Sequence, residues 1–406
     1  MRYLEEHQLI SDRQYGFRQR RSAGDLLAYL THRWSEAIEG KGEALAVSLD
    51  VAKAFDRVWH KALLAKLPSY GLPEKLCAWI SSFLEGRSIK VVVDGACSDP
   101  KPINAGVPQG CVLSPTLFLL HINDMLQFSN IHCYADDSTC DALYTARDNV
   151  SRATADENQT KLVSELETLL GEVSDWGRRN LVEFNPKKTQ VCAITAKKQP
   201  FVIDLRFEGT PLVASASIGI LGVDISSDVQ FRGHLEDKAK LASKKLGVLS
   251  RAKQYFQPGH RLQLYKAQVR PHMEYCSHLW AGAPQYQLLP FDRIQRRATR
   301  IVNDRALTDR LDTLALRRDV SCLCIFYRLY HGECSEELFG TIPAAEFRHR
   351  TTRQTARYHP YHLDGWHSTT VRFSRNFLPR TAALWNGLSS AVFPNHYDLG
   401  SFKKRA

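Results

Sequence analysis

The chain has 406 residues, 44% of them hydrophobic and 24% charged, the balance of an ordinary globular protein rather than a disordered or fibrous one. Its 54 Lys and Arg outnumber 43 Asp and Glu, which suits a polyanionic partner but is weak support for one by itself. No apolar run reaches the roughly 18 residues of a membrane span, and MRYLEEHQLI is too polar for a signal peptide. We therefore expect no membrane partner and an intracellular protein of the nucleus, the cytoplasm or both.

The first 230 residues mix helical and strand patterns, so we expect an α+β fold there. Residues 25–40, 57–67, 114–126 and 158–180 have apolar side chains at helical spacing, and 44–51, 88–95 and 189–195 have the pattern of strands. Ser114 and Pro115 have the residue types of an N-cap and a first helical position. One face of 158–180 collects Leu162, Leu166, Leu169, Leu170, Val173 and Trp176.

The pattern changes near residue 231. Residues 231–305 are mostly helical and basic, with a break at Pro258 and Gly259 and an end or kink at Pro271. The last hundred residues are rich in Arg, His and aromatic residues, as in FRHRTTRQTARYH (347–359). We therefore predict three units, 1–230, 231–305 and 306–406, the last of uncertain fold.

None of the ten cysteines forms a Cys-x-x-Cys pair with a second pair downstream, so the sequence does not indicate a zinc site. Cys322, Cys324 and Cys334 with His331 come nearest to one. Buried thiols of a helix are the favoured interpretation of these three cysteines.

Three aspartates directly follow apolar runs that resemble buried strands. Asp50 ends 44–50, and Asp136 and Asp137 follow 131–134 in a strand, tight turn, strand pattern. If the strands pair side by side, three mutually repelling carboxylates meet at one edge of a sheet. Such a cluster suits Mg²⁺, and two such ions can activate a 3′-hydroxyl and stabilise a leaving pyrophosphate. For the adjacent pair alone, an ordinary hairpin turn is the alternative.

The segment AGVPQGCVLSP (105–115) lies between these acidic segments. Gly106, Pro108 and Gly110 indicate a rigid loop that opens a helix, and a helix N-terminus favours anions. Gln109 is a candidate contact for a base or a sugar. A plain loop before a helix is the alternative.

Five motifs in this order and spacing resemble the palm motifs of reverse transcriptases: LDVAKAFDRV (49–58), GVPQGCVLSP (106–115), YADD (134–137), NPKKTQ (185–190) and LGVDI (221–225). QYGFRQRRSAGDLLAYL (14–30) is similar to the block before them. The chain resembles the reverse transcriptase of a non-LTR retrotransposon of the jockey-like type. This implies a right-hand polymerase fold, with a palm and partial fingers in 1–230, a helical basic thumb in 231–305 and a C-terminal region.

The resemblance implies a role for each matching residue. Asp50, Asp136 and Asp137 match the catalytic carboxylates and, with the Val51 carbonyl, the metal ligands. Lys188 matches the lysine near the leaving phosphates, where it would act as a general acid. A solvated surface lysine is an equal alternative, and Lys187 is the other candidate for the role.

The resemblance also implies contacts with substrates. Phe55 matches the gate that excludes a ribose 2′-hydroxyl. It also has the place of a core aromatic at a strand-to-helix junction, and both can be true. Gln109 and Gly110 would lie beside the incoming nucleotide. Arg18 is the arginine that remains in the fingers and is a candidate contact for the nucleotide, with an open role. Tyr134, Leu221 and Gly222 would hold the primer end. Phosphate contacts in the thumb are expected among Lys244, Lys245, Arg251, Arg296, Arg297 and Arg300, although a charge run is usually a solvated face.

The expected activity is that of an RNA-directed DNA polymerase that uses Mg²⁺, with Mn²⁺ as a substitute, an RNA template, a DNA primer and dNTPs. Family members carry an arginine-containing fingers block before the position that corresponds to residue 3, so we expect a truncated chain. A relic that only binds nucleic acid is the alternative. An RNA-templated RNA polymerase is disfavoured by Phe55. The oligomeric state is left open.

Overall fold

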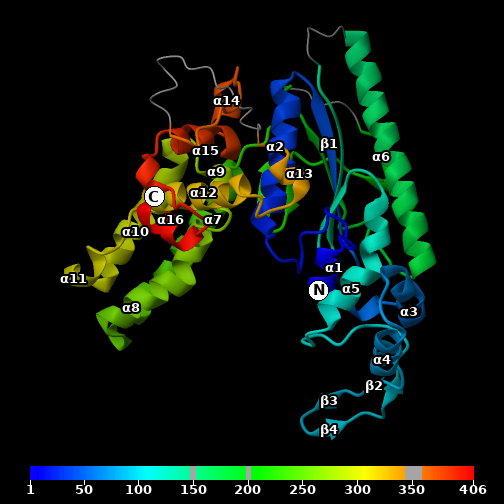
Figure 1. The fold of residues 1–406 in the computed structure, drawn as a ribbon. Helices are drawn as coiled ribbons and strands as arrows, with labels where there is room; N and C mark the ends of the chain where they lie inside the picture. The colour runs from blue at the N-terminus through cyan, green and yellow to red at the C-terminus, as the bar shows by residue number, and fades with distance from the viewer. Residues whose placement is uncertain (147–151, 198–202, 343–358) are drawn as a thin grey trace.

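The computed structural model describes residues 1–146, 152–197, 203–342 and 359–406 (Figure 1). Within them, an antiparallel four-stranded sheet has the order β6 (Ile131–Tyr134), β7 (Asp137–Tyr144), β1 (Glu43–Leu49), β8 (Gln190–Ile194). In the register of the sheet, Leu49 lies opposite Ser138, and Tyr134 lies opposite Asp137. The mixture of helix and sheet agrees with the predicted fold class.

The strand β1 is buried on both faces because its alternate side chains enter two different cores. Ala44 and Ala46 belong to the core that includes α2 (Ala23–Glu39). Leu45 and Val47 belong to the core that includes α6 (Arg152–Asn180). Figure 1 shows the two helices on opposite sides of β1. The sheet therefore separates two hydrophobic cores.

Most of the predicted elements are confirmed. The helix predicted at 25–40 is α2, the helix predicted at 158–180 is the longer α6, and the strand predicted at 189–195 is β8. All six apolar residues of the predicted face of α6 are buried. The strand, turn and strand around Asp136 form the hairpin of β6 and β7.

Three predictions were wrong in detail. The helix predicted at 57–67 is α3 (His60–Lys66), preceded by a 3₁₀ turn (Ala54–Arg57), because Val58 is not helical. The segment 88–95 holds only the short strands β2 (Ser88–Ile89) and β3 (Val92–Val93), which lie in an exposed hairpin without a core to extend them. Leu113, not Ser114, is the N-cap of α5 (Ser114–Ile122), because the Ser114 hydroxyl donates to the Pro108 carbonyl at 2.7 Å.

The other elements of this half are short: α1 (Arg2–Glu6), α4 (Glu74–Leu84), β4 (Ala96–Cys97), β5 (Lys101–Pro102), β9 (Leu205–Phe207), β10 (Thr210–Leu212), β11 (Ser217–Ile220) and β12 (Val223–Ser226). After residue 231 the described residues form helices and no strand, as predicted for 231–305: α7 (Arg232–Ala252), α8 (Pro258–Leu264), α9 (Ser277–Trp280), α10 (Gln285–Val302), α11 (Arg305–Thr308), α12 (Leu314–Tyr330), α13 (Glu336–Phe339), α14 (Val371–Ser374), α15 (Phe377–Asn386) and α16 (Leu399–Arg405).

The helices on both sides of residue 305 share one core. Phe291 of α10, Phe326 of α12 and Leu26 of α2 are buried in the same cluster. Because one core joins these helices, the division into the units 1–230, 231–305 and 306–406 stays a prediction. Residues 343–358, which hold nearly all of the basic segment 347–359, lie outside the described residues. In the part of the chain that the structure describes, no helix has both the length and the apolarity that crossing a membrane requires.

The buried carboxylate of Asp141 links α2 to the sheet. The Asp141 side chain on β7 is fully buried, and the Trp34 indole N–H donates to its Oδ2 at 3.0 Å. Arg33 lies 3.6 Å from Oδ1. A buried carboxylate that loses a hydrogen-bond donor is poorly compensated, so this contact stabilises the packing of α2 on the sheet.

Trp34→Phe keeps an aromatic ring but removes the donor to Asp141. We expect a loss of about 1–3 kcal/mol of stability from the unpaired oxygen, seen as a lower thermal midpoint by circular dichroism. Trp79→Phe is the matched control, because the Trp79 side chain on α4 is exposed. Equal losses in both variants would contradict a special role for the buried hydrogen bond.

Candidate active site

The register of the sheet brings the three predicted carboxylates to one edge. Asp50 directly follows β1, and because Leu49 pairs with Ser138, Asp50 lies beside Asp137 at the start of β7. The hairpin between β6 and β7 closes with the two-residue loop Ala135–Asp136, in which Ala135 has φ +57°. A two-residue loop with positive φ matches the twist of the paired strands.

The negative charges of Asp50 and Asp136 affect the ionisation of Asp137. Partial burial, and then the charges of Asp136 and Asp50, raise the pKa of Asp137 above its ordinary value. Lys188 opposes this negative charge, with its Nζ 3.4 Å from Asp50 Oδ2. The Lys188 side chain is 68% exposed, so it is free to reach toward a ligand. No ion pair of Lys187 is recorded among the described residues.

The donor set fits a hard divalent cation, which prefers oxygen ligands and an excess of negative charge. Val51 forms an isolated antiparallel bridge with Phe184. In this bridge Ala52 N donates to the Glu183 carbonyl at 2.9 Å, and Asn185 N donates to the Asp50 carbonyl at 2.9 Å. No recorded hydrogen bond in the described residues uses the Val51 carbonyl. Among those residues, however, no three His, Cys, Asp or Glu side chains converge closely enough to hold an ion by themselves. An ion here would need ligands beyond the carboxylates.

The same finding applies to the cysteine cluster of the C-terminal part. Burial raises the pKa of Cys322 and of Cys334 to about 12, so both stay protonated at neutral pH. Cys324 shows a raised pKa for the same reason. The favoured interpretation, buried thiols of a helix, holds for Cys322 of α12. Cys324 of the same helix is only partly buried, and Cys334 is partly buried in the segment between α12 and α13.

The loop 105–110 packs against the turn that follows β1. Gly106 N donates to the Val58 carbonyl at 2.9 Å, and Val107 N donates to the Phe55 carbonyl at 2.8 Å. Gly106 has φ +91°, and a Cβ there would meet the Asp56 carbonyl oxygen at 2.9 Å, so the approach requires glycine. Gln109 Nε2 donates to Asp56 Oδ1 at 3.2 Å. This docking holds Gln109 and Gly110 beside the turn that carries Phe55.

Phe55 is part of an aromatic stack. Its ring lies parallel to Phe118, with centroids 4.7 Å apart, and meets Phe17 edge-on at 6.0 Å. Phe118 is buried in the α6 core, whereas Phe17 is half exposed. The stack fixes the Phe55 ring in place while leaving Phe17 accessible.

A hollow of about 740 Å³ lies next to the paired aspartates. Its lining includes Asp136, Asp137, Tyr134 and the Leu221–Gly222 turn between β11 and β12. The structure therefore brings the residues predicted to hold the primer to the same hollow as two of the predicted carboxylates.

Sequence reasoning missed two residues that line this hollow, Phe17 and Tyr275. The Tyr275 hydroxyl donates to the Leu221 carbonyl at 2.8 Å, and Leu221 and Gly222 both have positive φ. Tyr275 thus braces a strained turn from a part of the chain that is far away in sequence. Phe17 stood within the block 14–30, but nothing in that pattern distinguished it.

The structure does not bring Arg18, a candidate nucleotide contact, to the hollow beside the paired aspartates. Its side chain is 5% exposed and lies in an ion pair with Glu5, with Nε at 3.0 and 3.1 Å from the two carboxylate oxygens. The Ser11 carbonyl accepts a further hydrogen bond from Nη1. Because these partners saturate the guanidinium, Arg18 has a structural role and does not line the hollow.

The six predicted phosphate contacts lie on α7 and α10, which pack together. Lys245 is partly exposed and the others are exposed, and none of them forms an ion pair with a described residue. None lines the hollow at the aspartates: Lys244, Lys245, Arg251, Arg296, Arg297 and Arg300.

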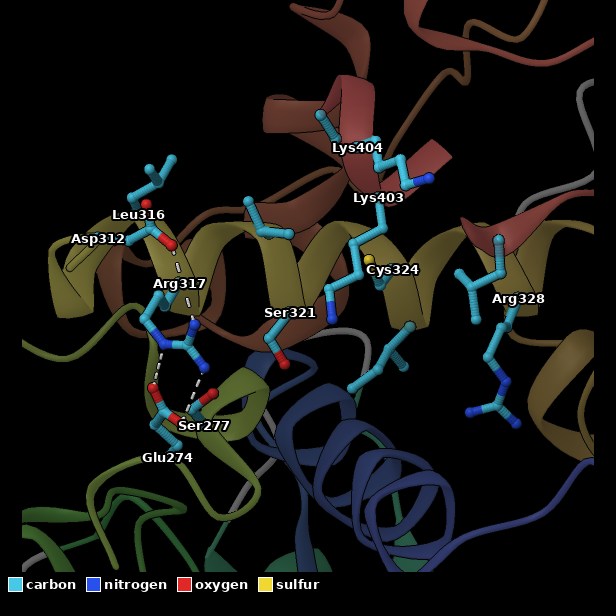
Figure 2. A pocket seen from close by; sticks show the side chains of 14 residues that line it. Glu274, Ser277, Asp312, Leu316, Arg317, Ser321, Cys324, Arg328, Lys403 and Lys404 are labelled. Carbon is cyan, nitrogen blue, oxygen red and sulfur yellow. Dashed lines mark hydrogen bonds and ion pairs between the residues drawn. The ribbon is translucent and has the colours of Figure 1, made fainter. Parts of the chain in front are cut away.

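A hollow of similar size, about 750 Å³, lies between α12 and α16 (Figure 2). It contains none of the predicted site residues. Arg317 points to Glu274, with Nη2 at 3.1 Å from Oε2, so much of its charge is already compensated.

Comparisons with known proteins agree with the motifs. A family model described as reverse transcriptase (RNA-dependent DNA polymerase) matches residues 1–225, more than half of the chain. The chain is 28% identical over 313 residues to the probable RNA-directed DNA polymerase from transposon BS of Drosophila melanogaster, covering 74% of this chain and 33% of that protein.

Two further relatives extend the match. The probable RNA-directed DNA polymerase from transposon X-element of Drosophila melanogaster is 26% identical, over 89% of this chain and 40% of that protein. The RNA-directed DNA polymerase from mobile element jockey of Drosophila funebris is 29% identical, over 71% of this chain and 32% of that protein. The matched region thus spans 32–40% of the length of these three relatives.

Among solved structures, apo telomerase from Candida tropicalis is 11% identical with a TM-score of 0.38, over 83% of this chain and 53% of that one. This likeness is too distant to define the fold.

The raised pKa of Asp137 means that the folded state loses stability relative to the unfolded state as the pH rises through the range of carboxyl titration. Asp137→Asn removes this charge, so we expect the thermal midpoint at pH 7.5 in EDTA to rise by about 1–2 °C. The gain should shrink as the pH falls below about 4, where the carboxyl is protonated in both states.

Asp94→Asn is the matched control for Asp137→Asn, because Asp94 lies in the exposed hairpin. An equal rise of the midpoint in both variants would show a general effect of net charge and not repulsion within the cluster.

Proposed function

The chain belongs to the reverse transcriptase family, and we propose that it is an RNA-directed DNA polymerase of the non-LTR retrotransposon type. It would transfer nucleotides from dNTPs to the 3′-hydroxyl of a primer paired with an RNA template. One observation carries the proposal: the pairing of β1 with β7 puts Asp50 beside the Asp136–Asp137 hairpin. The Leu221 turn lines the same hollow as Asp136 and Asp137, and so does Phe17, which the Phe55 ring contacts.

The proposed division of the chain follows the polymerase hand. Residues 1–230, with the sheet and its two flanking helices, form the palm and part of the fingers. Residues 231–305, with α7 and α10, form the thumb, and residues 306–406 form a C-terminal region that packs on both. In support, α7 follows β12 directly and packs against it, as a thumb that continues from the palm would.

We propose that Asp50, Asp136 and Asp137, with the Val51 carbonyl, bind Mg²⁺, and that Mn²⁺ can replace it. When bound, the metal would make the primer hydroxyl a better nucleophile and neutralise charge that develops on the phosphates. Partial burial, and then the charges of Asp136 and Asp50, raise the pKa of Asp137. This supports the assignment, because a bound cation would favour the ionised form of the carboxyl.

Lys188 would hold a proton at Nζ close to the leaving phosphates. Its present partner is Asp50, and a metal that takes the Asp50 carboxylate would release the ammonium toward the triphosphate. A cation in that place stabilises the departing pyrophosphate and can donate a proton to it.

Phe55 would serve as the sugar gate. Since the Phe118 ring lies parallel behind it and Phe17 lies at its edge, the ring cannot retreat from a nucleotide sugar. A ribose 2′-hydroxyl would collide with it, whereas a deoxyribose would pack against it. Gln109 and Gly110 would border the same nucleotide from the neighbouring loop.

Primer and template would be held by shape and charge. Tyr134, Leu221 and Gly222 line the hollow beside the aspartates, where a primer end would lie. The six cations on α7 and α10 are available for phosphates, because they lack ion-pair partners in the described residues.

The first test is primer extension by the full chain on poly(rA)–oligo(dT) with dTTP and Mg²⁺. Asp50→Asn and Asp136→Asn each remove a metal ligand, so we expect extension to fall by at least about 10²–10³-fold. Binding of the duplex, measured by fluorescence anisotropy, should change by less than about twofold, because phosphate contacts elsewhere supply most of the affinity.

Asp309→Asn, at the end of α11, is the charge-matched control and should extend normally. If the parent chain binds the duplex in a salt-sensitive way but extends no primer, the polymerase proposal fails and a nucleic-acid-binding protein remains.

Phe55→Ala tests the gate. Removing the ring opens space for a 2′-hydroxyl, so we expect the preference for dTTP over UTP, as a ratio of kcat/KM, to fall by about tenfold or more. Phe83→Ala, on α4, is the matched control. Unchanged discrimination in the Phe55 variant would contradict the gate assignment.

A further inference from the structure

The buried side chain of Gln14 holds the loop that carries Asp136. Gln14 is 1% exposed. Its Oε1 accepts hydrogen bonds from Gly16 N at 2.8 Å and from Ala135 N at 2.9 Å, and its Nε2 donates to the Ala135 carbonyl at 3.4 Å. One amide therefore satisfies both backbone polar groups of Ala135, the residue before Asp136.

The segment around Gln14 runs parallel to the end of β6 and is hydrogen-bonded to the residues that lead into the Ala135–Asp136 loop. Cys133 N donates to the Arg13 carbonyl at 2.9 Å, and Tyr15 N donates to the Cys133 carbonyl at 2.8 Å. At Gly16 the approach is so close that a Cβ would meet Ala135 N at 2.2 Å. The backbone of residues 13–16 therefore lies directly against residues 133–135. The Gln14 side-chain amide fills the space between these two segments and bonds to both.

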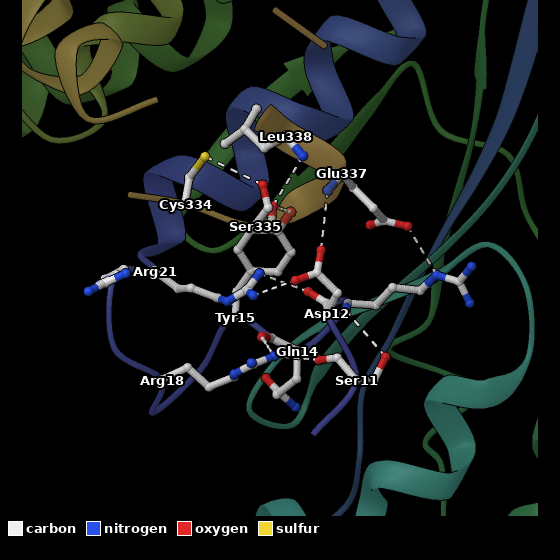
Figure 3. Close-up of polar contacts among 12 residues, drawn as sticks. Ser11, Asp12, Gln14, Tyr15, Arg18, Arg21, Cys334, Ser335, Glu337 and Leu338 are labelled. Carbon is white, nitrogen blue, oxygen red and sulfur yellow. Dashed lines mark hydrogen bonds and ion pairs between the residues drawn. The ribbon is translucent and has the colours of Figure 1, made fainter. Parts of the chain in front are cut away.

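The start of α13 in the C-terminal part of the chain contacts the segment 12–15 through hydrogen bonds and an ion pair (Figure 3). The hydroxyls of Tyr15 and Ser335 lie 2.7 Å apart, and Glu337 N on α13 donates to Asp12 Oδ2 at 3.2 Å. The Glu337 carboxylate also reaches Arg13 at 3.2 Å and His132 of β6 at 2.9 Å.

These contacts have a direct electrostatic effect. Although partial burial opposes it, hydrogen bonds and charge from His132 and then Arg13 hold the pKa of Glu337 below its ordinary value. Glu337 is therefore ionised at neutral pH and ties β6 and the Gln14 segment to α13.

We propose that Gln14, held in place by α13, is a positioning residue for Asp136. The inference rests on the proposed polymerase function. Ala135 has a positive φ without being glycine, so the loop needs external hydrogen bonds to keep this conformation. Metal ligands and reacting groups must be held to within a fraction of an ångström, and Gln14 supplies this precision without touching the substrate.

The closing experiment compares Gln14→Met with Gln159→Met in the full chain. Met keeps the approximate length of the side chain but cannot form the amide hydrogen bonds. Gln159 is the matched control, because its Nε2 donates to Glu43 at the opposite end of β1. The readouts are the thermal midpoint, duplex affinity, kcat and the Mg²⁺ concentration that gives half of the maximal rate.

For Gln14→Met we expect kcat to fall about 10–100-fold and the half-saturating Mg²⁺ concentration to rise several-fold, as for loss of other groups that orient metal ligands. Duplex affinity should stay within about twofold, because the phosphate contacts are untouched. If kcat and the Mg²⁺ requirement change no more than in Gln159→Met, Gln14 is merely structural and the inference is overturned.

Two additions keep the test decisive. If Gln14→Met does not fold, Glu337→Gln replaces it, and an unchanged Mg²⁺ requirement in that variant overturns the inference. Binding of Mn²⁺ to the chain with poly(rA)–oligo(dT), followed by electron paramagnetic resonance, reports on the aspartates without turnover. If the parent chain extends no primer, the proposed polymerase function fails. If the parent chain and Gln14→Met bind Mn²⁺ with equal affinity, Gln14 does not position Asp136 and the inference is overturned.

Discussion

The antiparallel pairing of β1 with β7 is the constraint on which the site depends. Its register puts Asp50 beside Asp137, and the two-residue hairpin adds Asp136 to the same edge. Three carboxylates in one place oppose folding unless a cation or hydrogen bonds compensate them. Lys188 supplies the cation in this structure. The tight loop, the docked segment 13–16 and the braced Leu221 turn hold the surrounding backbone in place.

The sheet can tolerate this repulsion because it is anchored strongly elsewhere. Both faces of β1 are buried, one against the core of α2 and the other against the core of α6. Apolar burial on two sides holds the register, since a slip by one residue would exchange every side chain between the two cores. The site is thus an electrostatically unfavourable edge on a firmly packed support, a pattern common at functional sites.

Local pattern was enough to predict the parts of the molecule that are decided locally. The apolar run of β1 and the helical spacing in α6 specify those elements, and strand ends followed by aspartates suggested the convergence at the sheet edge. Prediction failed where a side chain's contact partner decides the outcome, because residue type alone does not identify that partner. Ser114 has the residue type of an N-cap, but its hydroxyl is taken by Pro108. Arg18 has the charge for a phosphate, but Glu5 saturates it. Nothing in one sequence pairs Gln14 with Ala135 or Tyr275 with Leu221.

The continuous network from α13 to the Asp136 loop has a consequence for motion. The amides of Tyr15, Gly16, Cys133 and Ala135 all donate hydrogen bonds within one buried cluster. Gly16 and Ala135 are too close for either segment to move past the other. We therefore expect these amides to open together, as one cooperative unit in hydrogen exchange. Their exchange would require α13 to separate from residues 12–15, which it contacts through Asp12 and Tyr15.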